Sequence, residues 1–290
     1  MSADTVEATP SVKVAARKKI PVYRSSRSRF RAAYDDIADG LSLWSMWVPL
    51  TFSEIFGQFR RFALGVAWIP LGMVLVAYML GLVYSQMLGR DYWDYSLYLL
   101  AGFTFWQFIQ TSVLSGFGLF SKQASMINNV SLPFSYYIFK FIFEAFVNLM
   151  IVLPFVFIVA AFHGKLVSLE VLMIFPAILV YILTGIGVAF FMSILSVRVR
   201  DLESPLSSFM RVMFLVTPII WQVDQMQGSM RMLIATYNPF YHILEIARAP
   251  MLGEMATAVN WYVSLGVMGT FLVLSVFMFA RARHRIHYWL

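Results

Sequence analysis

Asp35, Asp36 and Asp39 form the one acidic cluster whose spacing could support catalysis. Carboxylates this close together could hold a magnesium ion for a glycosyl or phosphoryl transferase. Acidic residues are also common at the start of a helix, where they interact favourably with the helix dipole. His284 and His287 share a helix face, but no acidic or thiol ligand lies near them in sequence. We therefore expect helix-starting acids and no metal site.

Two pairs of opposite charge lie at helical spacing. Lys140 and Glu144 are one turn apart near one end of an apolar stretch. They either neutralise one another or line a polar pathway, because charges at membrane depth tend to face a protein interior. Glu245 and Arg248 are three residues apart, so they could form an ion pair on one helix face.

The usual signatures of nucleotide and metal enzymes do not occur in the 290 residues. There is no G-x-x-x-x-G-K-[ST] sequence, so the chain cannot hold nucleotide phosphates as a P-loop does, and there is no H-E-x-x-H sequence. The chain also has no cysteine, which excludes disulfides and thiol chemistry. We expect neither catalysis nor a bound cofactor in this chain.

The composition indicates a membrane protein. The chain is 60% apolar and 13% charged, whereas soluble domains are nearer half apolar and a quarter charged. A membrane-crossing helix needs about 20 apolar residues, and long uncharged stretches favour helices over barrel strands. The sequence predicts an all-α polytopic membrane protein whose six transmembrane helices cover residues 62–84, 96–120, 134–162, 171–197, 205–222 and 257–281.

The distribution of Lys and Arg predicts the orientation. Nearly all of them lie before the first predicted span, between the second and third, between the fourth and fifth, or after the sixth. The other side has only Arg90, Lys165, Arg231 and Arg248. The positive-inside rule then places both termini in the cytoplasm. The net charge of +7 reflects this topology, and nucleic-acid binding is not expected.

The N-terminal region divides in two. Residues 1–34 are polar and basic, contain no cleavable signal peptide, and predict a disordered cytoplasmic arm able to touch anionic lipid. Residues 35–61 predict an amphipathic helix that Pro49 breaks or kinks. This helix either lies in the membrane interface or packs on a partner protein, and both are compatible. Its apolar stripe comprises Ile37, Leu41, Trp44, Val48, Phe52, Ile55 and Phe59, and reaches Phe62.

Residues 222–255 are too long for a turn and too apolar for a solvated loop. Asn238-Pro239 divides them, and Pro250 ends the second half. We expect two re-entrant helices within residues 225–251, between the fifth and sixth spans. Residues 284–290 predict a cytoplasmic tail.

The chain is rich in rings, with 27 Phe, 14 Tyr and 8 Trp. Most such rings in a membrane protein pack in the core, face lipid or form interfacial belts. Rings also suit a sliding sugar, because a pyranose presents an apolar C–H face. The candidates for lining such a path are Trp68, Tyr78, Tyr84, Trp106, Phe209, Phe214 and Trp221.

An ordered set of short motifs from about residue 52 to residue 290 resembles the membrane subunit of type-2 ABC exporters for cell-surface polysaccharides. Each motif is weak alone, but their order and placement make the set specific. Two features depart from the family pattern: Asn129 stands where a basic residue is common, and the N-terminal arm is longer than expected. The motifs are residues 59–65 (FRRFALG) with Trp68 and Pro70, 98–102 (YLLAG) with Trp106, 122–130 with Leu132-Pro133, 198–201 (RVRD), 217–221 (TPIIW), Asn238-Pro239, 247–250 (ARAP) with Leu252-Gly253, and 285–290 (RIHYWL).

The resemblance implies a homodimer in the bacterial inner membrane, with a channel lined by the first and fifth spans. Two P-loop ATPase subunits would bind ATP and magnesium, so this chain would need no cofactor. The expected cargo is a polyprenyl-pyrophosphate-linked polysaccharide of the O-antigen type. Capsule or teichoic-acid export, and export of a small molecule or drug, are the alternatives. The residues considered without the resemblance leave one other alternative, a membrane glycosyltransferase or acyltransferase that uses Asp35, Asp36 and Asp39.

The resemblance also implies roles for individual residues, according to their positions in the sequence. ATPase coupling is assigned to Lys122, Gln123, Ser125, Met126, Asn128, Asn129, Leu132, Arg198, Arg200 and Asp201. The substrate pathway is assigned to Trp68, Tyr78, Tyr84, Phe209, Phe214, Trp221, Lys140 and Glu144. An external gate is assigned to Tyr237, Asn238, Pro239, Glu245 and Arg248.

Overall fold

The computed structural model describes residues 28–165, 169–223 and 228–290, and every regular element in that part of the chain is helical. The α-helices are α1 (Arg29–Ser42), α2 (Trp44–Gln58), α3 (Trp68–Leu88), α4 (Tyr92–Gln110), α5 (Leu119–Lys122), α6 (Ala124–Asn129), α7 (Phe134–Phe162), α8 (Ile174–Arg198), α9 (Glu203–Val216), α10 (Gly228–Tyr237), α11 (Pro239–Met251), α12 (Ala258–Ala282) and α13 (Ile286–Trp289). Short 3-10 or π segments are η1 (Gly65–Ala67), η2 (Thr111–Ser115), η4 (Leu169–Met173), η5 (Arg200–Leu202) and η7 (Arg283–Arg285).

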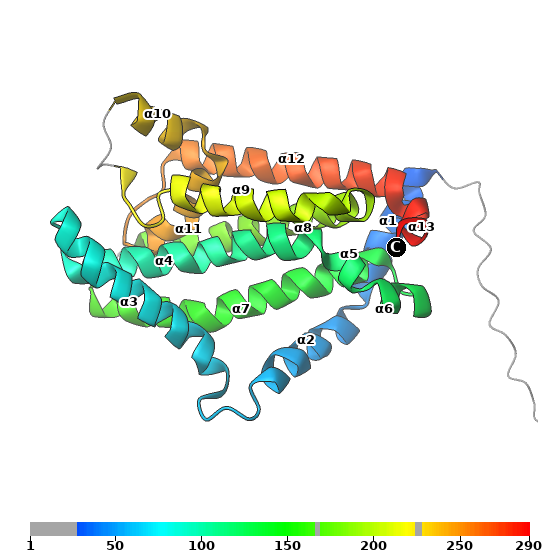
Figure 1. Ribbon diagram of the computed structural model, residues 1–290, viewed down its shortest axis with the longest axis horizontal. Helices are drawn as coiled ribbons and strands as arrows, with labels where there is room; N and C mark the ends of the chain where they lie inside the picture. The colour runs from blue at the N-terminus through cyan, green and yellow to red at the C-terminus, as the bar shows by residue number, and fades with distance from the viewer. Residues whose placement is uncertain (1–27, 166–168, 224–227) are drawn as a thin grey trace, which may run out of the picture.

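Five segments of the described chain are long and apolar enough to cross a membrane. They are Gly65–Leu88, Tyr92–Ser115, Phe134–Phe162, Leu169–Arg198 and Ala258–Trp289. α4, α7, α8 and α12 run along the long axis of the molecule, and α3 is inclined to them (Figure 1). The predicted all-helical membrane fold is therefore confirmed.

The fifth predicted span is shorter than the others. α9 has 14 residues, which rise about 21 Å, whereas the hydrocarbon core of a bilayer is about 30 Å thick. Thr217 and Pro218 end the helix, and the chain continues without helix to residue 222. Six complete spans, and the membrane re-entry of α10 and α11, stay predictions. The division of that region at Asn238-Pro239 agrees with the sequence.

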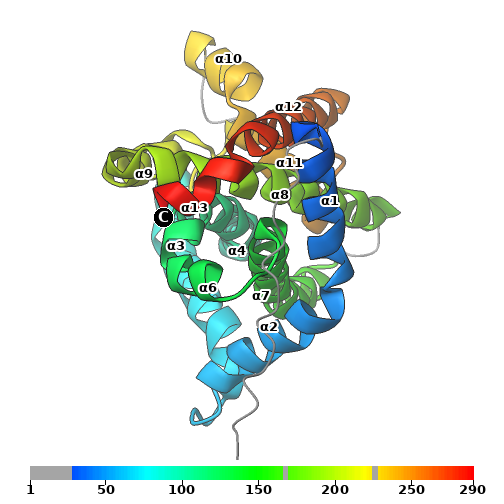
Figure 2. The ribbon, with the colours of Figure 1, turned by 90° about the vertical axis from the view of Figure 1, so that its right-hand side faces the viewer.

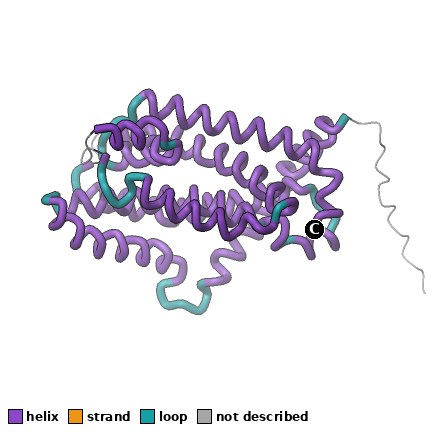
Figure 3. The backbone as a smooth tube through the Cα atoms, turned by 45° about the horizontal axis from the view of Figure 1, so that its top comes forward, coloured by secondary structure: helices purple, strands orange, loops and turns teal. Residues whose placement is uncertain are grey.

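The two ends of the bundle differ in charge. One end carries α1, α5, α6, α13 and the C-terminus (Figure 1), and we call it the basic end because Arg198, Arg200, Arg281, Arg283 and Arg285 lie there. α10 lies at the opposite end, and most loops gather at one end or the other (Figure 3). This grouping follows the predicted charge asymmetry, while the side of the membrane stays a prediction.

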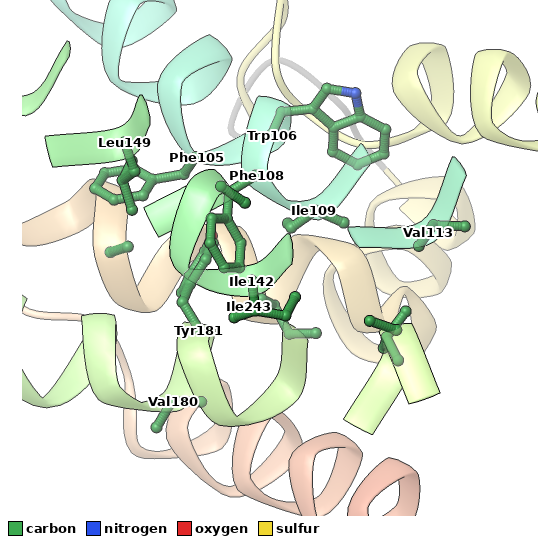
Figure 4. Packing of buried hydrophobic residues seen from close by; sticks show 14 of the residues in the cluster. Phe105, Trp106, Phe108, Ile109, Val113, Ile142, Leu149, Val180, Tyr181 and Ile243 are labelled. Carbon is green, nitrogen blue, oxygen red and sulfur yellow. The ribbon is translucent and has the colours of Figure 1, made fainter. Parts of the chain in front are cut away.

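α4 forms the centre of the core. In the 18-residue apolar stretch of its candidate span, 72% is buried inside the structure. The helix α4 packs on α3, α7, α8 and α11. The rings of Phe105 and Phe108 of α4 pack at an angle against the Tyr181 ring of α8, with Ile243 of α11 beside them (Figure 4). α8 and α12 approach closely at Gly187, where a Cβ would lie 2.9 Å from the Phe271 carbonyl carbon. Small residues permit this close packing in membrane helices.

The N-terminal helices differ from the predicted single helix over residues 35–61. Residues 1–27 lie outside the described part of the chain, and α1 begins at Arg29 rather than at residue 35. The break falls at Leu43, and α2 runs through Pro49. Packing explains why Pro49 does not break α2: buried side chains on both sides of it, Trp47, Thr51 and Ile55, hold one face against α7.

The other face of α2 is apolar and open. Trp44 is 62% exposed and Phe56 is 47% exposed. An apolar face outside the bundle suits the predicted position at the membrane interface, and the packed face shows that α2 is also part of the fold.

Asp36 fixes α1 to the bundle at the basic end. Its buried carboxylate accepts hydrogen bonds from the Ser135 backbone N–H at 3.1 Å and from the Arg283 guanidinium at 2.7 Å. Ser135 is the second residue of α7, so the negative charge also meets the positive end of the α7 dipole. Gly40 permits the contact, because a Cβ there would lie 2.1 Å from Ser135 Oγ. Asp36 therefore joins α1, α7 and the C-terminal segment.

We expect Asp36→Asn to lower the free energy of unfolding by about 2–3 kcal/mol, because hydrogen bonds to a charged group contribute about 1.5–3 kcal/mol. Thermal unfolding of the purified chain in detergent micelles measures this loss. Asp39→Asn, at an exposed position of the same helix, is the control and should change little. Equal unfolding temperatures for the two variants would show that the Asp36 contacts do not stabilise the fold.

Candidate functional site

A short helix projects at the basic end. α6 is held by one buried side chain, Ile127, which is 4% exposed. Around it Lys122, Ser125, Asn128 and Asn129 are exposed, while Gln123 and Leu132 are half-buried. Two exposed apolar side chains complete the surface, Met126 at 43% and Val130 at 44%. We call residues 122–132 the docking tip.

The turn after α8 lies at the same end. Arg198, Arg200 and Asp201 are all exposed there. α8 contacts both α5 and α13, and Arg200 Nη2 donates to the Trp289 carbonyl oxygen at 2.9 Å. The structure thus brings both groups of predicted coupling residues to one end of the bundle.

Lys140 pairs with a residue that the sequence analysis did not identify. Its Nζ lies 2.6 and 2.8 Å from the two carboxylate oxygens of Glu54 on α2. Glu144 and Gln123 line a cavity of about 150 Å³ beside this pair. Lys140 thus forms its ion pair with Glu54 instead of Glu144, and the role of Lys140 and Glu144 in lining a pathway stays a prediction. The ion pair joins α2 to α7 where both approach the docking tip. Spacing could not reveal it, because Glu54 and Lys140 are 86 residues apart.

The aromatic candidates fall into separate places. Trp68 is 51% exposed on α3 and Phe209 is 47% exposed on α9. Both helices lie on the same side of the bundle, at the left of Figure 2. Tyr78 and Tyr84 are half-buried, and the Tyr78 ring packs edge-on against Tyr92 and Trp93.

The remaining rings serve packing. Trp106 is 3% exposed and contacts Phe214 and Phe240, so it is a core residue. Phe214 also stacks on Phe103 of α4. Trp221 donates its indole N–H to the Leu215 carbonyl oxygen at 3.0 Å. Of the predicted ring candidates, Trp68 and Phe209 have the most open positions.

Two amide side chains in the candidate spans were missed. Gln107 of α4 and Asn148 of α7 line a cavity of about 270 Å³ that α3 also borders, with Thr104 and Thr111 beside them. Gln107 is exposed on the surface of the single chain. Polar side chains at membrane depth usually face a protein interior or water. The sequence feature that could have identified these two residues is an amide side chain within an otherwise apolar stretch.

The end opposite the basic end contains a buried polar cluster around residues 217–221. α9 ends there, so the following carbonyl groups have no helical partner. Arg248 Nη1 donates to the Pro218 oxygen at 2.6 Å, and the Tyr98 hydroxyl lies 2.9 Å from the oxygens of Pro218 and Trp221. The Tyr95 hydroxyl donates to the Ile220 oxygen. We call this set the carbonyl clamp.

Arg248 is the centre of the clamp. It is 2% exposed, its Nε and Nη2 donate to Glu245 Oε2 at 3.2 and 2.5 Å, and its guanidinium lies 4.2 Å from the centroid of the Tyr98 ring. The ion pair expected from the spacing of Glu245 and Arg248 is confirmed.

Asn238 holds the neighbouring segment. Its side-chain oxygen caps α11 through the Phe240 N–H, and its Nδ2 donates to Thr217 Oγ1 at 3.1 Å. Pro239 is the first residue of α11, and Tyr237 is 71% exposed at the end of α10. Of the five predicted gate residues, Asn238 and Arg248 therefore contact the segment that follows α9, and Glu245 pairs with Arg248. The gating role of all five stays a prediction.

Asp36 is not available as a catalytic metal ligand. Its carboxylate is buried and engaged by Ser135 and Arg283, and Asp39 is exposed. This geometry removes the main support for a transferase that uses the acidic cluster.

Comparison with known proteins places these features in a family. The family described as ABC-2 type transporter matches residues 49–252. The O-antigen export system permease protein RfbA of Myxococcus xanthus is 19% identical over 198 residues, which cover 68% of this chain and 76% of that protein. An O-antigen export system permease protein RfbA of Klebsiella pneumoniae is 23% identical over the same shares.

We expect Arg248→Gln to destabilise the fold by about 3–5 kcal/mol, because it leaves the buried Glu245 carboxylate without its partner. Thermal unfolding in detergent micelles is the measurement. Arg211→Gln is the matched control, since Arg211 is exposed and bonds within its own helix to Ser207 and Ser208. If Arg248→Gln unfolds at the wild-type temperature, the clamp does not support the end of α9.

Proposed function

The chain belongs to the ABC-2 type transporter family, and we propose that it is the permease subunit of an ATP-driven exporter. Its cargo is a polyprenyl-pyrophosphate-linked polysaccharide of the O-antigen type, which it moves across the bacterial inner membrane. The names of the relatives from Myxococcus xanthus and Klebsiella pneumoniae support this choice of cargo.

The docking tip is the observation that carries the proposal. Met126 and Val130 expose apolar surface between polar neighbours at the basic end, outside the candidate spans. Grouped exposed apolar side chains are typical of a protein interface. Because the sequence has no P-loop, the ATP and magnesium belong to a partner ATPase that docks on this tip.

The coupling path runs from the docking tip into the bundle. Met126 of α6 and the neighbouring Gln123 line the same cavity as Glu54 of α2 and Lys140 of α7, so a displacement of α6 would change a space that α2 and α7 border. Because the Lys140 and Glu54 side chains are 16% and 39% exposed, their ion pair is partly shielded from water. Movement of the ATPase subunits is transmitted through this contact.

Two copies of the chain enclose the pathway. Trp68 on α3, Phe209 on α9 and Gln107 on α4 are exposed in the single chain. These three side chains face the same surface of a second copy. The Trp68 and Phe209 rings offer stacking faces for sugars, and the Gln107 amide offers hydrogen bonds to sugar hydroxyl groups. The carbonyl clamp and the Tyr237–Asn238–Pro239 segment form the external gate, with both termini in the cytoplasm.

A second candidate function is export of a smaller apolar molecule. One observation favours it: an apolar cavity of about 290 Å³ lies inside the single chain between α4, α8, α9, α11 and α12. Such a cavity fits a compact ligand and not a polysaccharide. Capsule or teichoic-acid export differs from the main proposal only in the glycan.

Met126→Glu tests the docking tip. Burial of an unpaired carboxylate in the ATPase interface costs several kcal/mol, and 1.4 kcal/mol is already about tenfold in affinity. We expect at least a tenfold loss of the copurifying P-loop ATPase and of ATP hydrolysis. Met255→Glu is the control, because Met255 is 65% exposed beyond the candidate spans, in the loop before α12. Full ATPase recovery with Met126→Glu would refute docking at this tip.

Deletion of the gene tests the cargo. We expect lipid-linked glycan to accumulate on the cytoplasmic leaflet and surface glycan to disappear. Immunoblotting of surface polysaccharide and mass spectrometry of extracted polyprenyl-linked intermediates measure both effects. Unchanged surface glycan in the deletion strain would favour the small-molecule candidate.

A further inference from the structure

A basic cavity lies at the basic end and shares no lining residue with the docking tip or the carbonyl clamp, although Arg198, one of the predicted coupling residues, lines it. Its volume is about 680 Å³, and the start of α1, the end of α8, the end of α12, and η7 with α13 form its walls. Arg29, Arg198, Arg281 and Arg285 line it together with His284. Among the described residues that line it, none is acidic. We call it the arginine pocket.

The four arginines of the pocket are open to a ligand. All four side chains are exposed. Within the described chain, none of them forms an ion pair with a carboxylate. The neighbouring Arg283 turns away and pairs with Asp36, and Arg200 bonds to the Trp289 carbonyl oxygen. These two arginines have a structural role. Arg285 donates its Nε to His284 Nε2 at 3.2 Å, which leaves its two terminal nitrogens for a ligand, and Arg29, Arg198 and Arg281 form no hydrogen bond or ion pair through their side chains in the described part of the chain.

The floor of the pocket is apolar and continues into a candidate membrane span. Ile194 and Val197 of α8 are buried beneath it, and Phe277 and Met278 of α12 form its side. The Arg281 guanidinium lies 4.2 Å from the centroid of the Phe277 ring. Further along α12, Val273 is 70% exposed. One ligand could therefore place an anionic group on the arginines and apolar chains along α12.

We propose that the arginine pocket binds the phosphate headgroup of an anionic phospholipid, with the acyl chains along α12. Guanidinium groups bind phosphate oxygens in a bidentate geometry and lose little hydration in doing so. Basic pockets between membrane helices on the cytoplasmic side suit phosphate headgroups. A free inorganic anion shares the phosphate chemistry but would leave the apolar floor uncovered.

The position of the pocket separates it from the proposed export pathway. The view onto the basic end in Figure 2 shows α1 and α12 on the side of the bundle away from α3. Arg29, Arg198 and Arg281 belong to three different helices, α1, α8 and α12. A phospholipid held there connects these helix ends, so it stabilises the same junction that Asp36 holds through Arg283.

The test uses the full chain in a neutral detergent, with added phosphatidylglycerol or phosphatidylcholine, and with inorganic phosphate or pyrophosphate as separate additions. Native mass spectrometry counts bound lipid, and thermal unfolding measures stabilisation. We expect phosphatidylglycerol alone to remain bound and to raise the unfolding temperature. R281Q/R285Q should weaken this binding about tenfold or more, since one basic residue near a lipid headgroup contributes about fivefold.

R60Q/R61Q is the matched control, because it removes two exposed positive charges outside the pocket. Its lipid affinity should stay within about twofold of wild type, well below the loss expected of the pocket variant. Equal weakening in the two double variants would show diffuse attraction and overturn the proposal. Stabilisation by phosphate or pyrophosphate as large as that by phosphatidylglycerol would overturn the assignment to lipid, and so would absence of any lipid effect. Each result is independent of ATPase binding and glycan export.

Discussion

Lipid offers no hydrogen bonds to the peptide backbone, and this constraint governs how the fold can end a helix inside a bundle. α9 stops at Val216, which leaves the carbonyl groups of Pro218, Ile220 and Trp221 without helical partners. Tyr95, Tyr98 and Arg248 supply donors from α4 and α11. A buried arginine is costly alone, so Glu245 accompanies it. α4, the most buried helix of the core, and α11 thus both donate hydrogen bonds to this one irregular segment.

The basic end uses charge differently. There, side chains distant in sequence fasten the elements that a docking partner would contact. Asp36 ties α1 to α7 and the C-terminal segment, and Glu54 ties α2 to Lys140 of α7. α7 receives both contacts, so both N-terminal helices are linked to one long helix through two carboxylates. At the basic end, where we propose that the ATPase docks, polar contacts therefore join the helices to the bundle. Between the two ends, the helices are held together mainly by apolar packing.

Sequence patterns predicted what periodicity and composition can encode. Long apolar stretches identified the five complete candidate spans, Asn238-Pro239 marked the division between α10 and α11, and helical spacing identified the Glu245–Arg248 pair. Contacts between distant segments could not be predicted. Glu54 and Lys140 are far apart in sequence, the donors of the carbonyl clamp come from separate helices, and Pro49 suggested a break that packing on α7 prevents. Trp106 looked like a lining ring because sequence does not show which face of α4 is buried.

The shortness of α9 has a consequence for the bilayer itself. A helix that rises about 21 Å beside neighbours long enough to cross the bilayer would create a hydrophobic mismatch on one side of the molecule. Bilayers respond to a short hydrophobic segment by local thinning, at a cost of fractions of a kcal/mol per Å. Where lipid reaches α9, the two leaflets would therefore approach one another. A polar headgroup that crosses beside α9 would travel a shorter distance through hydrocarbon than one that crosses beside a full-length span.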